Sequence, residues 1–128
     1  MNDRFSFDST GSVDLNSTLR GSGSVIKNGS GTLTVAGVNG NSYSGGTIIN
    51  NGKLVWGVVV NGISPECGLA LGTGPVTLNA GAAIEFQHVR ASNAMTLNGG
   101  TILSPNGWGV SLSGAVLLNG IEIGRAHV

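Results

Sequence analysis

The 128-residue chain contains little charge, and this scarcity excludes several classes of protein. Only 9% of its residues are charged, with six Lys or Arg balanced by six Asp or Glu. Nucleic-acid-binding proteins need a basic surface that attracts phosphate, and a formal net charge of +0 does not provide one. An acidic activation segment or a charged disordered tail is excluded for the same reason.

Cysteine and long apolar runs are also scarce. Cys67 is the only cysteine, so neither a disulfide framework nor a cysteine-based zinc cluster can form within the chain. The apolar run Leu54–Val60 is interrupted by Gly57 and is much shorter than the roughly 20 residues that a membrane-spanning helix needs. Met1–Gly11 lacks the apolar stretch of a signal peptide. We therefore expect no membrane contact by this segment itself.

Glycine and small polar residues are abundant instead. Gly, Ser, Asn and Thr together account for 59 of the 128 residues, and all four are weak helix formers. The composition therefore disfavours a helical bundle. The 13 Val, 12 Leu and 8 Ile supply enough apolar surface to argue against simple disorder. We predict one β-rich structural unit, as is usual for this length.

A short motif, Val or Met followed by any residue, Leu and Asn, recurs along the chain. Its four copies begin at Val13, Val76, Met95 and Val116. Similar runs centred on Leu33 and Leu54 fill the gap, and the combined series advances by 20, 21, 22, 19 and 21 residues. A period of this length is typical of solenoid and propeller proteins.

Turn residues separate the apolar runs, and Asn-Gly pairs occur seven times. Both β-hairpins and the corners of β-solenoids use such turns, because Asn and Gly tolerate positive φ. The near-constant advance favours a solenoid, since one coil of a three-faced β-helix needs about 20 residues at about 3.3 Å each. We predict an all-β fold: a parallel, right-handed β-helix of about six coils, with apolar columns inside and Asn or Ser ladders at the corners.

The segment Gly21–Val55 contains the features of a known repeat in the same order and at similar spacing. The matching residues are Gly21, Gly23, Lys27, Gly29, Gly31, Leu33, Gly37, Tyr43, Gly45, Gly46, Thr47, Gly52 and Leu54. In this pattern the segment resembles the autotransporter-associated β-strand repeat. The following segment, Leu71–Leu78, looks like the short coil that often comes after that repeat.

The resemblance implies a β-helical passenger of a type V secreted protein, exposed on the surface of a Gram-negative bacterium or released from it. Such proteins are exported by a signal peptide and anchored by a C-terminal outer-membrane barrel, and neither part is evident in this sequence. We therefore expect an internal segment of a longer passenger. Its first partners would be the neighbouring coils of the same chain.

The last seven residues differ in composition from the Val-, Leu-, Asn- and Gly-rich sequence before them. Glu122–Val128 reads EIGRAHV and resembles the in-frame translation of a sequencing adapter. We therefore expect residues 1–121 to form the β-helical segment and residues 122–128 to be a non-native tail. This interpretation also removes Arg125 and His127 from the candidates for chemistry.

No motif for catalysis, cofactor binding or metal binding emerges, and we expect no cofactor. The polar stretch Glu85–Arg90 places His88 and Arg90 on one face of a strand, but a positioned second partner for this pair is missing. Tyr43 and Trp108 are weak candidates for stacking on a sugar, although buried packing is the more common role of isolated aromatic residues.

We predict that the segment is a non-catalytic stalk or scaffold of a surface passenger. Two alternatives remain open at this point. The first is an adhesin-type surface that binds an extracellular glycan or a host protein through residues such as Tyr43 or Trp108. The second is a fragment of a β-helical polysaccharide-degrading enzyme, which needs clustered carboxylates and whose turnover would disappear when Asp14 or Glu85 is changed.

Overall fold

The computed structural model describes residues 4–15, 19–35, 41–57, 71–87, 89–103, 110–119 and 122–123. Every regular element within these ranges is a β-strand. In chain order the strands are β1 (Arg4–Phe7), β2 (Val13–Leu15), β3 (Ser24–Lys27), β4 (Thr32–Val35), β5 (Thr47–Ile49), β6 (Gly52–Trp56), β7 (Val76–Asn79), β8 (Ala82–Phe86), β9 (Val89–Ala91), β10 (Met95–Asn98), β11 (Thr101–Leu103), β12 (Val110–Leu112), β13 (Val116–Leu118) and β14 (Glu122–Ile123).

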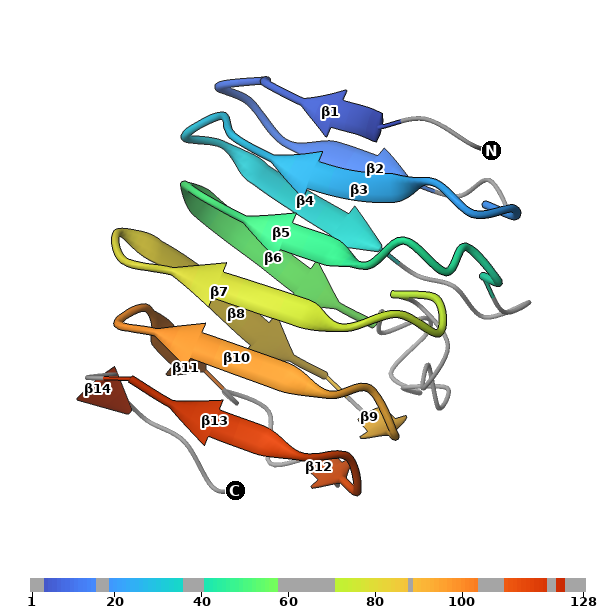
Figure 1. Ribbon diagram of the computed structural model, residues 1–128. Coiled ribbons are helices and arrows are strands. Elements are labelled where there is room, and N and C mark those ends of the chain that lie inside the picture. The colour runs from blue at the N-terminus through green and yellow to red at the C-terminus, as the bar shows by residue number, and fades with distance from the viewer. Residues whose placement is uncertain are drawn as a thin grey trace.

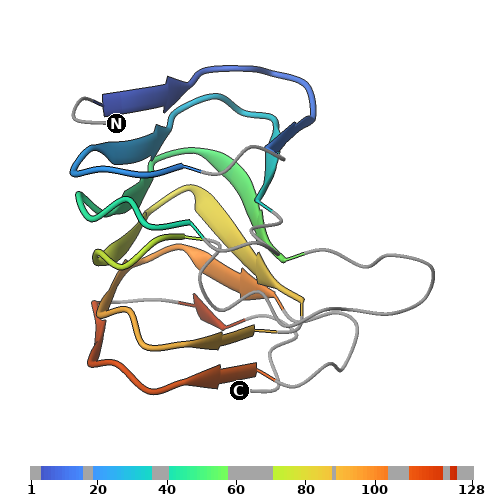
Figure 2. The same cartoon turned by 90° about the vertical axis from the view of Figure 1, so that its right-hand side faces the viewer.

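The strands form three parallel sheets. Sheet A has the order β1-β3-β5-β7-β10-β13, sheet B has the order β14-β11-β8-β6-β4-β2, and β9 pairs with β12 in a short third sheet. Each strand pairs with its counterpart one coil earlier and one coil later, so the chain winds as a solenoid with its first strands at one end and its last strands at the other (Figures 1 and 2). The predicted all-β, parallel β-solenoid fold is confirmed.

The number of coils differs slightly from the expected six. About four turns, from β3 and β4 to β10 and β11, enclose a buried apolar interior. In the first turn, three residues of β1 are exposed, and in the last turn all of β13 is exposed. The end turns lack a neighbour on one side, so their inward side chains stay open to solvent.

Strand alternation explains which side chains enter the interior. In β4, β7 and β10, every second side chain is buried, as a strand with one buried face requires. The inward side chains align in columns because pairing joins equivalent positions of successive coils. The columns of sheet A run Phe5–Val25–Thr47–Val76–Met95–Val116 and Phe7–Lys27–Ile49–Leu78–Leu97–Leu118. Sheet B contributes the column Val13–Leu33–Leu54–Ile84–Ile102.

These columns correct the repeat series inferred from the sequence. Val13, Leu33 and Leu54 lie in sheet B, whereas Val76 and Met95 lie in sheet A. The sequence series therefore passes from one face of the solenoid to the other. The cause is one long coil: Thr47 and its register partner Val76 are 29 residues apart, whereas Val76 and Met95 are 19 apart. A constant sequence period does not follow a structural column across such a coil.

None of the described residues forms a helix that is long and apolar enough to cross a membrane.

Candidate functional site

A ladder of asparagine side chains follows the corner between sheets A and B. Its five members are Asn28, Asn50, Asn79, Asn98 and Asn119. From Asn50 onward, each Nδ2 donates to the Oδ1 of the asparagine one coil earlier, with N···O distances of 2.8, 2.7, 3.0 and 2.9 Å along the chain. The predicted corner ladder is therefore present and is built from asparagine.

The strands place these amides in line. Asn28, Asn50 and Asn119 come directly after β3, β5 and β13, and Asn79 and Asn98 are the last residues of β7 and β10. Parallel strands in register keep equivalent residues about 4.8 Å apart. This spacing lets one amide reach the next, and the chain then turns toward sheet B.

Glycines of the repeat motif permit the coils to approach closely at the corners. A Cβ atom on Gly31 would lie closer than 3.0 Å to backbone atoms of Thr10 and Gly11, and one on Gly45 would meet the backbone of Ser22 and Gly23 as closely. Gly52 has a φ of 69°, which L side chains rarely adopt, and a Cβ there would meet the Gly29 and Gly31 carbonyls. The motif glycines described here thus have a packing role.

Two other motif residues point into the interior. Tyr43 is 1% exposed, and its hydroxyl lies 2.6 Å from the Thr47 Oγ1. Burial raises the pKa of the Tyr43 phenol to about 12, although the hydrogen bond with Thr47 acts in the opposite direction. This placement favours a packing role, because the buried ring offers no exposed face to a sugar.

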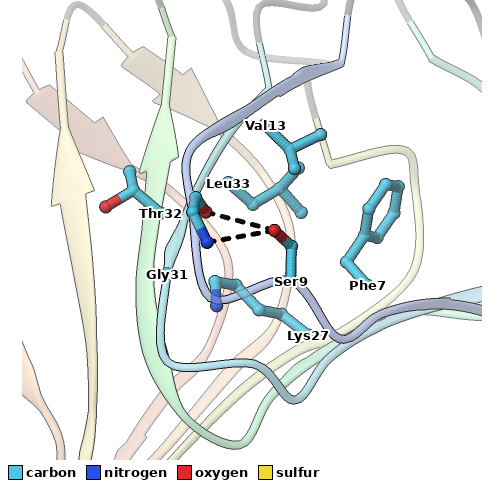
Figure 3. Close-up of a pocket in the computed structure, with 8 residues that line it drawn as sticks. Phe7, Ser9, Val13, Lys27, Gly31, Thr32 and Leu33 are labelled. Carbon is cyan, nitrogen blue, oxygen red and sulfur yellow. Dashed lines mark hydrogen bonds between the residues drawn. The ribbon is translucent and has the colours of Figure 1, made fainter.

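Lys27 occupies the inward column between Phe7 and Ile49 and is 2% exposed. Its ammonium donates to the Gly29 carbonyl at the corner. Burial lowers the pKa of Lys27, because the charged form loses hydration. The adjacent hollow is lined by Phe7, Ser9 and Val13 among others (Figure 3). With a volume of about 10 Å³, it has room for no more than one water molecule.

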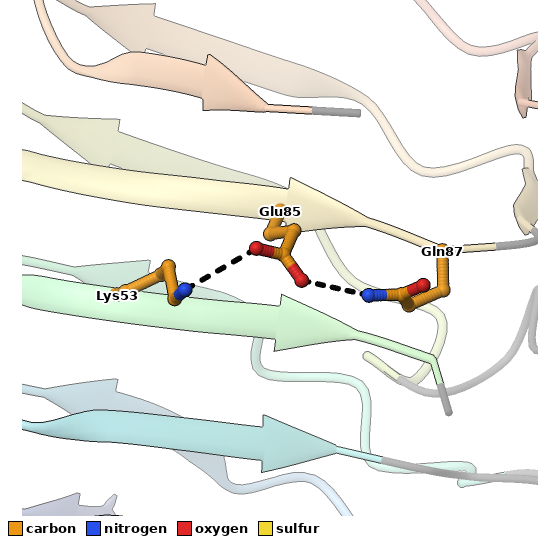
Figure 4. A network of polar contacts seen from close by, with 3 residues as sticks. All are labelled: Lys53, Glu85 and Gln87. Atoms are coloured by element: carbon orange, nitrogen blue, oxygen red, sulfur yellow. Dashed lines mark hydrogen bonds and ion pairs between the residues drawn. The ribbon is translucent and has the colours of Figure 1, made fainter. Parts of the chain in front are cut away.

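The outer face of sheet B has a small polar network. The Lys53 ammonium lies 3.2 Å from Glu85 Oε1, and Gln87 Nε2 donates to Glu85 Oε2 at 2.7 Å (Figure 4). Lys53 lies on β6, Glu85 lies on β8, and Gln87 follows β8 directly. The ion pair is partly exposed and contributes little to stability by itself, about 0–1 kcal/mol.

The structure does not bring Asp14 and Glu85 together. Both lie in one outward column of sheet B, but Thr34 and Val55 occupy the two positions between them. Three coil steps of about 4.8 Å separate them by about 14 Å, beyond the roughly 5–9.5 Å of a glycosidase carboxylate pair. These two residues cannot act together as acid and base across one glycosidic bond.

Several predicted residues fall outside the part of the chain that the structure describes. Gly37, Cys67, His88, Trp108 and residues 124–128 belong to this group. Glu122 and Ile123, expected to begin the tail, form β14 and pair with Thr101 and Ile102. The boundary between the β-helical segment and the tail stays a prediction. Among the described residues, no cluster of His, Cys, Asp or Glu could hold a metal ion.

Sequence reasoning missed two buried asparagines that stabilise the solenoid backbone. Asn41 Oδ1 accepts a hydrogen bond from the Leu19 amide at 2.8 Å. Asn93 Nδ2 donates to the Gly72 and Gly74 carbonyls at 3.2 and 2.7 Å. The two residues stand in different sequence contexts, so no shared local motif distinguishes them from the exposed asparagines.

A family model for the passenger-associated-transport-repeat matches residues 25–55. The match begins in β3 and ends in β6, so it covers two successive coils with both asparagine corners between their strands. The match spans 31 of the 128 residues. The resemblance inferred from Gly21–Val55 is thereby confirmed.

Most of the chain is also similar to a protein that is named as an autotransporter. The chain is 32% identical over 103 residues to the adhesin BmaC autotransporter of Brucella suis biovar 1 (strain 1330). The alignment covers 80% of this chain but only 3% of that relative. No solved structure matches the chain. The passenger-associated transport repeat and this relative indicate a secreted or cell-surface protein of a Gram-negative bacterium.

Proposed function

We propose that this segment is a non-catalytic rod within an autotransporter passenger, where it holds other parts of the protein at a fixed distance. The observation that supports this role most directly is the continuity of the stack. Six strands of sheet A and six of sheet B pair in parallel from one end of the described chain to the other. Each coil contacts its neighbours through backbone hydrogen bonds, so bending the rod requires breaking them.

The asparagine ladder adds to this stiffness. Four amide–amide hydrogen bonds link five successive coils outside the backbone ladders. Buried polar groups are satisfied as well: among the described residues, no buried side-chain nitrogen or oxygen lacks a partner. A fully satisfied stack has a low tendency to open locally, which suits a spacer.

Distances between spin labels test the rigidity of the rod. We would place labels at Thr10→Cys and Ala115→Cys in a Cys67→Ser background, since both positions are exposed. Thr10 lies between β1 and β2 in the first coil, and Ala115 directly precedes β13 in the last, about five coil steps or about 24 Å apart along the axis. A rod gives one narrow distance distribution of at least this length. A broad distribution would contradict the proposal.

An adhesin-type surface is the second candidate, and the name of the Brucella relative favours it. On the described surface, Lys53 and Glu85, whose side chains are 37% and 14% exposed, offer an ammonium and a carboxylate that can hydrogen-bond sugar hydroxyls, while the buried Gln87 holds Glu85 from behind. Binding of the 128-residue chain to a glycan array, lost in Glu85→Gln or Trp108→Ala but kept in Asp14→Asn, would support this function over a simple spacer.

The polysaccharide-degrading alternative has weaker support because Asp14 and Glu85 are too far apart to cooperate. Assays with pectin and other uronic-acid polysaccharides test it directly. We expect no turnover above buffer. Turnover that disappears in Asp14→Asn or Glu85→Gln would overturn the non-catalytic assignment.

A further inference from the structure

Three Asn-Gly pairs lie wholly within the described residues, namely Asn28-Gly29, Asn51-Gly52 and Asn98-Gly99. In such a pair the backbone nitrogen of the glycine can attack the side-chain amide carbon of the asparagine, because glycine has no Cβ to obstruct the approach. Water then opens the cyclic imide that forms, and the amide becomes a carboxylate. The rate at each pair depends on how the fold places the two reacting groups.

The fold brings these groups together at Asn51. The Gly52 N–H donates to the Asn51 Oδ1 at 2.9 Å, and Asn51 is exposed to water. Because a carbonyl bond is about 1.23 Å long, the Asn51 amide carbon is no more than about 4.1 Å from the Gly52 nitrogen. A small rotation of the side chain turns this contact from the oxygen to the carbon.

At Asn28 the same two groups bond to other partners. The Gly29 N–H donates to the Phe7 carbonyl of the previous coil at 3.2 Å, so its nitrogen is engaged in the stack. The Asn28 Oδ1 accepts from the Asn50 Nδ2 in the ladder at 2.8 Å. Attack on the Asn28 amide therefore competes with both contacts.

The ladder holds Asn98 from both sides. Its Nδ2 donates to the Asn79 Oδ1 at 3.0 Å, and its Oδ1 accepts from the Asn119 Nδ2 at 2.9 Å. Asn98 is also half-buried, whereas Asn51 is exposed. Turning the Asn98 amide toward Gly99 would break both ladder bonds.

We propose that Asn51-Gly52, at the corner between β5 and β6, is a modification site where water converts the Asn51 amide to a carboxylate, and that the asparagine ladder protects Asn28 and Asn98 from the same reaction. The bond from the Gly52 nitrogen to the Asn51 amide carbon forms while the bond from that carbon to Nδ2 breaks. The Gly52 amide proton passes to solvent, and Nδ2 leaves as ammonia with a proton taken from solvent. Water then opens the imide at one of its two carbonyls and gives aspartate or isoaspartate.

Either product changes this corner after the chain has folded. It adds a negative charge to a chain whose formal net charge is +0. The Lys27 ammonium lies at the same corner, since a Cβ on Gly52 would come closer than 3.0 Å to its Nζ. Isoaspartate also lengthens the main chain by one methylene where Gly52 packs closely on the Gly29 and Gly31 carbonyls. The reaction thus alters both the charge and the backbone of the rod at one defined place.

Peptide mapping by mass spectrometry tests this proposal in the full 128-residue chain. The folded protein is kept in mildly alkaline buffer made with oxygen-labelled water, so that each converted amide takes up the label and is measured at its own position. Each ladder bond is expected to slow the reaction about fivefold. Asn51 should then convert about fivefold faster than Asn28 and about thirtyfold faster than Asn98. Comparable conversion at the three positions would overturn the proposal.

The chain unfolded in guanidinium chloride is the control for local sequence. Unfolding removes the ladder and the contact of Gly29, so the three pairs should convert at similar rates. The same ranking in denaturant as in buffer would show that the local sequence, and not the fold, selects Asn51.

Asn79→Ala tests the protective role of the ladder separately. It removes the acceptor of the Asn98 Nδ2 and leaves the contact between Asn51 and Gly52 in place. Asn98 should convert about fivefold faster in this variant, with the rate at Asn51 unchanged as the internal reference. An unchanged rate at Asn98 would overturn the protection.

Discussion

The buried phenol of Tyr43 makes the stability of this protein sensitive to alkaline pH. Burial raises the pKa of Tyr43 in the folded chain to about 12, against about 10 in an unfolded chain. The folded state therefore keeps the phenol protonated at pH values where the unfolded state releases the proton. The resulting stabilisation is complete below pH 10 and is lost as the pH rises from 10 to 12.

The size of this loss follows from proton linkage. Each pKa unit corresponds to about 1.4 kcal/mol, so a difference of about two units removes roughly 2 kcal/mol from the free energy of unfolding by pH 12. Tyr43→Phe removes the titrating group and also the hydrogen bond to Thr47. We expect this variant to be about 1 kcal/mol less stable than the unchanged chain at pH 7 and more stable above about pH 11.

The assay is simple because Tyr43 is the only tyrosine in the chain. Tyrosinate absorbance then reports this one phenol, and circular dichroism at the same pH reports whether the strands remain. In Thr47→Val, the hydrogen bond that lowers the pKa is removed, so the titration midpoint moves further upward. A midpoint near 10 in the folded chain, with strand signal intact, would refute the reasoning.

Three further predictions concern stability and are measured by urea unfolding at pH 7. Phe86→Ala removes a fully buried ring that packs on Trp56 at a centroid distance of 5.6 Å. We expect it to lower the free energy of unfolding by about 3–5 kcal/mol. The control Leu117→Ala, at an exposed position, should lower it by about 0.5 kcal/mol or less. Similar costs for the two variants would contradict the assigned interior. Gly52→Ala should cost at least about 2 kcal/mol more than Gly81→Ala: both glycines have positive φ, but only at Gly52 would the added Cβ meet the backbone of an earlier coil. Asn79→Ala breaks two ladder bonds and Asn119→Ala breaks one, so the first should cost about twice as much, about 1–3 kcal/mol in all; equal losses would show that the interior links add nothing.

Local patterns predicted the class of fold well, because they depend on neighbouring residues. Alternation in Thr32–Val35 and Val76–Leu78 predicts strands with one buried face, and β4 and β7 occur there. The alternating run Thr96–Ile102 is not one strand, because a corner divides it between β10 of sheet A and β11 of sheet B. The advance of about 20 residues indicated coils, and the sheets are parallel throughout. These properties need no knowledge of which coil contacts which.

Register across the long coil was not predictable in this way. The sequence series joined Leu54 to Val76, although Leu54 pairs with Ile84 and Val76 pairs with Thr47. The additional residues between Trp56 and Val76 shift the sequence period relative to the structural columns, and only the register of the paired strands shows this shift. Which asparagines form the ladder was hidden for the same reason, since Asn50 and Asn79 are neighbours in space but 29 residues apart in sequence.

The sequence also does not show which lysine side chains point into the interior and which point outward. Nothing in the local sequence shows that Lys27 enters an apolar column while Lys53 stays on the outer face. Lys27 can do so because the corner offers the Gly29 carbonyl to its ammonium. Such a placement depends on the backbone of the turn, which alternation does not describe.

The long coil has a consequence for how such chains can change. Between β6 and β7 the sequence is longer than the period requires, yet β5 still pairs with β7 and β6 with β8 without a break in register. The additional length therefore leaves the pairing of the described strands unchanged. Closing a longer connection costs little free energy, since each doubling of its length adds only about 0.6 kcal/mol. A peptide grafted between Trp56 and Val76 is thus expected to leave the pairing of β5 with β7 and of β6 with β8 as it is.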